Sequence, residues 1–300
     1  MKTIFDRIVN IVNYINVHPL AKKHKFISYL KFINWQLAQF INPRERIVSF
    51  TNKTFLAVKK GMTGATGNIY LGLHEFSDMG FLLHFLRETD VFFHIGANIG
   101  SYTILASGHC KAKSVCFEPI NTTFKTLQKN IDLNQLQDLA TAKNIGIGEV
   151  ESILTFTNSM DTINHVVKEY QNSKFVTEVP VYPADIFLKD FNCPILVKID
   201  VEGYEAWVLK GMPLILKDTN LKAIIIELNG SGYKYDIDEI QIHAELLKLN
   251  FQPYDYNPFT RILTPLKSFG TANTIYVREI SFVEIRVKNA DKIHLFSESF

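Results

Sequence analysis

Two hydrophobic patterns divide the chain near residue 46. Before it, apolar positions recur at helical spacing; they include Ile4, Ile8, Ile11 and Ile15, and then Phe26, Tyr29 and Phe32. After it, the stretch IVSFTNKTFLAVKKG has the strand–turn–strand pattern of a β-hairpin. We therefore predict an N-terminal helical extension over residues 1–46 and a main domain over residues 47–300.

Strands and helices alternate regularly in the main domain. The strand-like apolar runs include VFFHIG, SVCFEP, PILVKIDV and LKAIIIEL, and helical patterns such as NTTFKTLQKNIDLN stand between them. This alternation is typical of right-handed βαβ units, in which a parallel sheet is covered on both faces. The sequence predicts an α/β, doubly wound fold. In such sheets ligands bind beyond the carboxyl ends of the strands, where the strand order reverses.

Two shorter stretches carry local predictions. The glycines of GMTGATGNIYLG, namely Gly61, Gly64 and Gly67, are expected in turns rather than around a phosphate, because no strand leads directly into a helix there. Farther along, DIDEIQIHAELLKLN is expected to form a helix. Its apolar stripe would consist of Ile237, Ile240, Ala244 and Leu247.

Composition and charge narrow the function classes. The apolar fraction of 47% and the charged fraction of 21% are typical of a globular enzyme. A net charge of +2 gives no reason to expect nucleic acid as a partner. The three cysteines, Cys110, Cys116 and Cys193, show no CxxC spacing, so we expect neither a disulfide framework nor a metal site.

The N-terminal helices leave two arrangements open. Polar residues interrupt the apolar positions, so we expect no export signal or spanning helix and a cytoplasmic location. Four lysines stand beside the apolar positions: Lys22, Lys23, Lys25 and Lys31. The helices are expected either to pack on the main domain or to make peripheral contact with a membrane surface.

The loop that follows VFFHIG has features of a cofactor site. In GANIG, Gly96 and Gly100 flank Asn98, whereas a dinucleotide fingerprint needs glycine at that middle position to approach a pyrophosphate. A polar side chain there suits a ligand without phosphates, such as S-adenosylmethionine. Glu118 ends the next strand 22 residues after Gly96, an offset suited to a carboxylate that binds two ribose hydroxyls.

The strings HIGANIGSYTILAS, FEP and LVKIDVEGYEAWVLKG resemble the FkbM-type family of S-adenosylmethionine-dependent methyltransferases. The resemblance spans about residues 55–278, and KIDVEG at 198–203 is its most specific element. It implies a Rossmann-like class I methyltransferase fold with a mostly parallel seven-stranded sheet, whose last strand, NTIYVREI, is antiparallel. It also implies O-methylation of a sugar, glycan or secondary metabolite, with Gly96, Asn98 and Gly100 around the methionine part and Glu118 at the ribose.

One position departs from the family pattern. The family usually has Asp where this chain has His94, and that Asp is expected to attract the ammonium group of the methionine moiety. A protonated imidazole would repel the same ammonium group. We therefore expect His94 to weaken cofactor binding, increasingly so below about pH 6.5, the ordinary histidine pKa.

Acidic residues at the end of a later strand are candidates for catalysis. PILVKIDVEG places Asp200 and Glu202 at the edge that the cofactor would occupy. Either carboxylate could align the reactants or remove the acceptor proton, and Asp200 could also contact the cofactor. His165, in a polar cluster with Asp161, Thr162 and Asn164, is a third candidate base.

Three other functions compete with an O-methyltransferase that has a small-molecule or glycan acceptor. A nicotinamide-dependent oxidoreductase is disfavoured by Asn98 in place of the middle glycine. A nucleic-acid methyltransferase is disfavoured because no basic and aromatic surface segment stands out. The main alternative, motivated by His94, is a catalytically degenerate protein that keeps the fold as a binding or scaffolding module.

Overall fold

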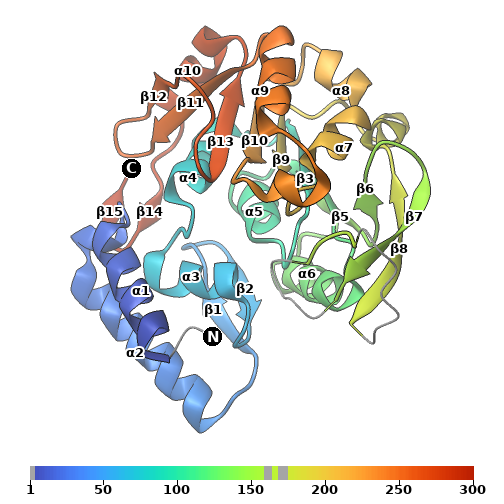
Figure 1. The fold of residues 1–300 in the computed structure, drawn as a ribbon. Coiled ribbons are helices and arrows are strands. Elements are labelled where there is room, and N and C mark those ends of the chain that lie inside the picture. Colours follow the sequence, from blue (N-terminus) through green and yellow to red (C-terminus); the bar gives the residue numbers. More distant parts are fainter. Residues whose placement is uncertain (1–3, 159–163, 168–174) are drawn as a thin grey trace.

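The computed structural model describes residues 4–158, 164–167 and 175–300. At its centre lies an eight-stranded sheet with helices on both faces (Figure 1), in the order β12-β11-β13-β10-β9-β3-β4-β5. The strands are β3 (Val91–Ile95), β4 (Lys113–Phe117), β5 (Ala140–Lys143), β9 (Leu196–Ile199), β10 (Ala223–Glu227), β11 (Gln252–Asn257), β12 (Ile262–Pro265) and β13 (Asn273–Val277).

Strand directions confirm the doubly wound α/β prediction. The five strands from β5 to β10 pair in parallel, whereas β13 runs antiparallel to both β10 and β11, as predicted for NTIYVREI. The predicted count of seven strands is one short, because β12 pairs antiparallel with β11 at the sheet edge. Only Leu263 is buried in β12, so its sequence lacks the apolar run that marks the central strands.

Alternate side chains of the central strands enter two separate cores. In β3, Phe92 packs on one face of the sheet, and Phe93 and Ile95 pack on the other. The first face is covered by α4 (Phe76–Phe85), α5 (Ser101–Thr103), its continuation as a π-helix over Ile104–His109, α6 (Asn121–Leu133) and α10 (Ile280–Lys288). The second is covered by the short helix at Ala184–Lys189, α7 (Glu205–Lys210), α8 (Pro213–Lys217) and α9 (Glu239–Lys248).

The predicted stripe on α9 is wrong. Ile242 and Leu246 face the sheet, while Ile240 is 64% exposed. The rotation of the helix is set at its first turn, where the Asp238 side chain caps it and the buried Glu239 carboxylate accepts the backbone N–H of Gly230. The prediction used only the spacing of apolar residues, so it took no account of these polar contacts.

The prediction of turns in GMTGATGNIYLG is also wrong for two of its glycines. Helix α3 (Thr63–Leu71) includes Gly64 and Gly67. A Cβ atom at Gly67 would lie 2.4 Å from Nδ1 of His74, so glycine at this position allows the helix to pack against that imidazole ring. Glycine marks close packing here rather than a turn.

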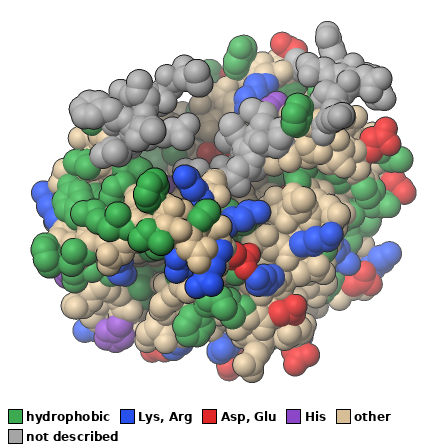
Figure 2. Space-filling view, turned by 90° about the horizontal axis from the view of Figure 1, so that it is seen from below, with side chains coloured by type: hydrophobic (Ala, Val, Ile, Leu, Met, Phe, Trp, Pro, Cys, Tyr) green, Lys and Arg blue, Asp and Glu red, His purple; other side chains and the backbone are tan. Residues whose placement is uncertain are grey.

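The N-terminal helices α1 (Ile4–Val17) and α2 (Lys25–Ile41) pack on α3. Ile15 and Phe32 form a small core with Tyr70 and Leu71. The predicted hairpin follows as β1 (Arg46–Ser49) and β2 (Phe55–Val58). Figure 2 views the molecule from the side on which this region lies, and hydrophobic side chains gather on part of that face. Among the described residues, no helix is long and apolar enough to cross a membrane.

Smaller elements complete the chain. Two small sheets lie outside the central one: β6 (Gly146–Ile147), β7 (Ser152–Thr157) and β8 (Val176–Tyr182) form one, and β14 (His294–Leu295) and β15 (Glu298–Ser299) the other. Short 3-10 helices cover Ala21–Lys23 and Ser231–Tyr235. The three cysteines are free thiols.

Candidate active site

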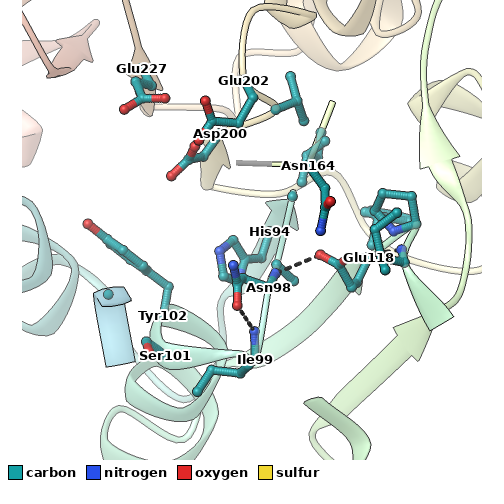
Figure 3. A pocket seen from close by; sticks show the side chains of 18 of the residues that line it. His94, Asn98, Ile99, Ser101, Tyr102, Glu118, Asn164, Asp200, Glu202 and Glu227 are labelled. Carbon is teal, nitrogen blue, oxygen red and sulfur yellow. Dashed lines mark hydrogen bonds between the residues drawn. The ribbon is translucent and has the colours of Figure 1, made fainter. Parts of the chain in front are cut away.

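A cavity of about 270 Å³ opens at the carboxyl ends of β3, β4, β9 and β10. Its volume is close to the lower end of the range for ligand pockets, roughly 300 Å³. Figure 3 shows its polar side chains in two groups, with Glu118 and Asn98 in one and Asp200, Glu202 and Glu227 in the other. The cavity therefore lies where ligands bind in doubly wound sheets.

The loop after β3 is pressed against the end of β9. Gly96 has a φ of 78°, and a Cβ atom there would lie 1.8 Å from the carbonyl oxygen of Asp200. Gly100 has a φ of 91° and stands at the start of α5. Asn98, with a φ of 49°, uses its side-chain oxygen to accept the backbone N–H of Ile99 at 2.7 Å. The two glycines thus allow a tight loop that lines the cavity, while Asn98 stabilises its turn.

Glu118 closes the other side of this loop. Its carboxylate accepts the backbone N–H of Asn98 at 2.8 Å and that of Ile120 at 2.9 Å. Burial raises the pKa of Glu118 to about 7, despite these two hydrogen bonds. A carboxylate has about four acceptor positions, so two remain for a ligand. This geometry fits the adenosine ribose that the sequence predicted for Glu118.

The surroundings of His94 favour its neutral form at neutral pH. It is buried, its Nδ1 lies 2.9 Å from the hydroxyl oxygen of Thr103, and its ring stacks on Phe92. Burial, together with the nearby Lys198 ammonium group, lowers the pKa of His94 to about 3. The expectation that His94 becomes protonated near pH 6.5 is therefore wrong, because it used the pKa of an exposed imidazole.

Three carboxylates converge at the ends of β9 and β10. One oxygen each from Asp200, Glu202 and Glu227 lie within 4.8 Å of one another. Strand β9 ends at Ile199, so the alternation of a strand does not bring them together. Glu202 instead has a left-handed backbone with a φ of 57°, an uncommon conformation that is often found at functional sites. Asp200 and Glu202 are the two acidic residues that the sequence predicts at this edge of the sheet.

The three carboxyl groups differ in acidity. Burial alone would raise the pKa of Asp200, but the ammonium group of Lys198 holds it below its usual value. Burial and the charge of Asp200 raise the pKa of Glu202 to about 6 and that of Glu227 to about 8. At neutral pH Asp200 and Glu202 are thus mainly ionised, while Glu227 mainly keeps its proton.

Lys198 is a buried cation that the sequence analysis did not assign to the site. Its side chain is fully buried, and its Nζ atom donates to Asp200 at 3.1 Å and to the side-chain oxygen of Asn273 at 2.8 Å. Burial alone would lower the pKa of Lys198, but Asp200 and other carboxylates raise it above its usual value. A buried charge is tolerated only when it is paired and hydrogen-bonded in this way.

A hydrogen-bond network extends from Lys198 to the opposite wall of the cavity. The amide of Asn273 donates to Glu75 at 2.7 Å and to Asp78 at 3.1 Å. The hydroxyl of Tyr102 donates to the second oxygen of Glu75 at 2.7 Å. The network joins four segments that are distant in the sequence and fixes Lys198 beneath the carboxylates.

His165 lies outside the cavity wall. Its backbone pairs with Thr157 of β7, and the neighbouring Asn164 is the residue that lines the cavity. Asp161 and Thr162, which belonged to the same predicted cluster, lie outside the described residues. A catalytic role for His165 stays a prediction, and the three converging carboxylates, unlike His165, line the cavity.

Comparison with known proteins identifies related sequences. Residues 94–253, just over half of the chain, match the family model of the methyltransferase FkbM domain. The hexuronic acid methyltransferase AglP of Haloferax volcanii is 28% identical over 173 residues, which cover 56% of this chain and 70% of that protein. Methyltransferase 1 of Beauveria bassiana is 29% identical over 143 residues, 39% of this chain and 56% of that protein.

Two solved structures are similar to this chain at lower identity. Methyltransferase FkbM from Methylobacillus flagellatus is 18% identical, with a TM-score of 0.44, and the match covers 64% of this chain and 44% of that one. A precorrin-6y C5,15-methyltransferase from Geobacter metallireducens is 12% identical, with a TM-score of 0.40, over 68% of this chain and 88% of that one. The chain thus spans less than half of the M. flagellatus protein and little more than half of Methyltransferase 1.

Proposed function

Because this chain belongs to the methyltransferase FkbM family, we propose that it transfers a methyl group from S-adenosylmethionine to a hydroxyl oxygen of a sugar, glycan or metabolite. One observation carries the proposal. A single cavity holds a buried carboxylate suited to ribose, Glu118, beside the loop of Gly96, and a cluster of acceptor-side carboxylates around Asp200. Family membership supports a methyltransferase. We propose S-adenosylmethionine as its methyl donor and a hydroxyl oxygen as its acceptor atom.

The cofactor proposal follows from charge and shape. S-adenosylmethionine, when bound, supplies a methyl group on a positively charged sulfur and also carries an ammonium group. Carboxylates on the cavity wall favour such a cation, and Asp200 stays ionised because Lys198 holds its pKa low. Glu118 would accept the two ribose hydroxyls, while Gly96, Asn98 and Gly100 would surround the methionine part. Neutral His94 would contact it without repelling its ammonium group.

Glu202 is the best-placed general base among the carboxylates. An effective base has a pKa near the working pH and is ionised when the acceptor binds. The pKa of Glu202, about 6, meets both conditions, whereas Asp200 is a weaker base and Glu227 mainly keeps its proton at neutral pH. We therefore assign removal of the acceptor proton to Glu202, and electrostatic positioning to Asp200.

A sugar acceptor has the most support. The relative AglP is named for methyl transfer to hexuronic acid. We expect turnover with isotopically labelled S-adenosylmethionine on at least one member of a panel of nucleotide sugars, free glycans and lipid-linked glycans, including uronic acids. Labelled methyl ether in the product, identified by mass spectrometry, would support the proposal. Cofactor binding without transfer to any acceptor would instead favour the scaffolding alternative, and transfer to nitrogen or carbon would refute O-methylation.

Cofactor affinity is expected to decline as the pH falls, because of Glu118 rather than His94. The pKa of Glu118 is about 7, so its ionised fraction rises from about one tenth at pH 6 to about nine tenths at pH 8. If the ionised form binds the ribose, the dissociation constant measured by calorimetry should be up to about tenfold higher at pH 6 than at pH 8.

Two variants separate the candidate groups in this measurement. Glu118→Gln should bind weakly at both pH values, because an amide has no proton to lose in this range. His94→Asn should keep the slope, since the pKa of His94, about 3, lies below the range. A slope that disappears in His94→Asn, or that is as steep in Glu118→Gln as in the parent chain, would contradict the assignment.

A further inference from the structure

Helix α2 has two apolar faces, and only one of them is covered. The inner face, with Phe32 and Trp35, is buried. The outer face repeats at helical spacing, and its exposed residues are Phe26, Leu30, Ile33, Leu37, Phe40 and Ile41. Phe40 is 86% exposed and Phe26 is 75% exposed. A helix that is apolar on opposite sides is normally buried all round, so this outer face is suited to a further contact.

Exposed apolar side chains are concentrated in this part of the chain. Twelve of the 23 large hydrophobic side chains that are exposed in the described residues lie within residues 1–60, one fifth of the chain. They include Ile47 and Phe55 of the β1–β2 hairpin, which follows α2 directly. The Arg46 guanidinium group donates to the carbonyl oxygen of Ala38, so the start of the hairpin is held against α2. We call the exposed outer side of helix α2, formed by Phe26, Leu30, Ile33, Leu37, Phe40 and Ile41, the α2 face.

The same segment carries a large positive charge. Residues 1–60 contain eleven Lys and Arg against two Asp and Glu, a net charge of +9, although the whole chain carries only +2. The remaining 240 residues therefore carry −7. Lys22 and Lys25 are exposed at the start of α2, and Arg44 is exposed just after its end. Figure 2 shows Lys and Arg side chains beside the gathered hydrophobic ones.

We propose that the α2 face is a docking site for an anionic lipid bilayer. A helix that lies in a membrane interface combines an apolar face with flanking Lys and Arg, which the negative surface potential attracts. With 17 residues, α2 is about 26 Å long, shorter than the hydrocarbon core of about 30 Å, so it would lie on the bilayer rather than span it.

The positive charge also argues against a second copy of the chain as the partner that covers the α2 face. A symmetric dimer through the α2 face would place one +9 segment against another. An anionic surface instead complements this charge. The proposal does not depend on the methyl-transfer assignment, because lipid binding can be measured without cofactor or acceptor.

Sedimentation with vesicles tests the proposal on the full chain. We expect the protein to bind vesicles of phosphatidylcholine with about one third phosphatidylserine. Binding to pure phosphatidylcholine should be at least about tenfold weaker, and salt of about 0.5 M should weaken binding to the anionic vesicles by screening. Equal binding to both kinds of vesicle, or binding to neither, would overturn the proposal.

Matched variants locate the contact. The triple variant Phe26→Gln, Leu37→Gln and Phe40→Gln should lose at least about tenfold in vesicle affinity. The control triple variant Leu214→Gln, Ile240→Gln and Ile285→Gln alters side chains that are 61–64% exposed on three other helices, and should bind like the parent chain. Circular dichroism and thermal melting verify that both remain folded.

Two outcomes would reassign the α2 face. If the two triple variants bind vesicles equally, another surface makes the contact and the proposal is wrong. If analytical ultracentrifugation detects a dimer that only the α2 variant loses, and vesicles do not bind, the occupant is a second copy and the bilayer proposal is likewise overturned.

Discussion

Glu202→Gln is expected to lower the turnover number at least about 100-fold while leaving cofactor affinity within about twofold, because the amide cannot accept the acceptor proton. Glu202 stands on the cavity wall beside Asp200 and has the carboxyl pKa best matched to neutral pH, about 6. The parent enzyme should lose activity as the pH falls through about 6, since protonation removes the base. The variant should lack this acid limb.

Three other variants show whether the loss of turnover is specific to Glu202. Glu245→Gln, on the exposed side of α9, is the matched control and should keep full turnover. Asp200→Asn should raise the dissociation constant of the cofactor as well as lower turnover, because Asp200 is assigned to electrostatic positioning. If His165→Ala loses more turnover than Glu202→Gln on the best acceptor, the base is His165 and our assignment is wrong.

Lys198→Met is expected to destabilise the fold by about 3 kcal/mol. Removing one member of a buried ion pair leaves the other charge without compensation, which typically costs about 3–5 kcal/mol. We expect a destabilisation at the lower end of this range because the Asp200 side chain is 33% exposed toward the cavity. Other carboxylates around Lys198 would also lose their shared cation. Urea denaturation monitored by circular dichroism measures this loss of free energy of unfolding.

Two further variants test whether the uncompensated charge of Asp200 causes this loss of stability. Lys288→Met breaks an exposed pair with Glu284 on α10 and should cost less than about 1 kcal/mol. The double variant Lys198→Met, Asp200→Asn should be more stable than Lys198→Met alone, because it removes the unpaired carboxylate. If Lys198→Met costs no more than Lys288→Met, or if the double variant recovers no stability, then Lys198 does not neutralise the site.

That the loop after β3 and Glu118 lie together could be predicted because they follow two successive strands. The glycines of GANIG and Glu118 are close in the sequence, and their offset follows from the length of one strand–helix–strand unit. The structure places both on one cavity and links them through the backbone N–H of Asn98. Asp200 and Glu202 could be predicted for a similar reason, since both follow the end of a buried strand.

The cation beneath the carboxylates could not be predicted in the same way. Lys198 donates a hydrogen bond to Asn273, which lies 75 positions farther along the chain. Asn273 in turn donates a hydrogen bond to Glu75, which lies 198 positions away. No local spacing describes such a network. The protonation state of His94 cannot be predicted locally either, because its pKa depends on burial and on Lys198 of the neighbouring strand. Local sequence patterns predict the loops that line the cavity. The charges of the groups inside the cavity depend on residues that only the complete fold brings together.

The pairing of β3 with β9 has a consequence for how activity appears during folding. It joins residues 92–95 to residues 196–199, about one hundred positions apart. The loop after β3 and the carboxylates after β9 and β10 line the cavity from opposite sides of this junction. Pairings this distant in sequence form slowly, because a long stretch of chain must first lose its freedom. A refolding intermediate could contain most of its helices and still have no binding site. We therefore expect cofactor binding to return only with the slowest refolding phase.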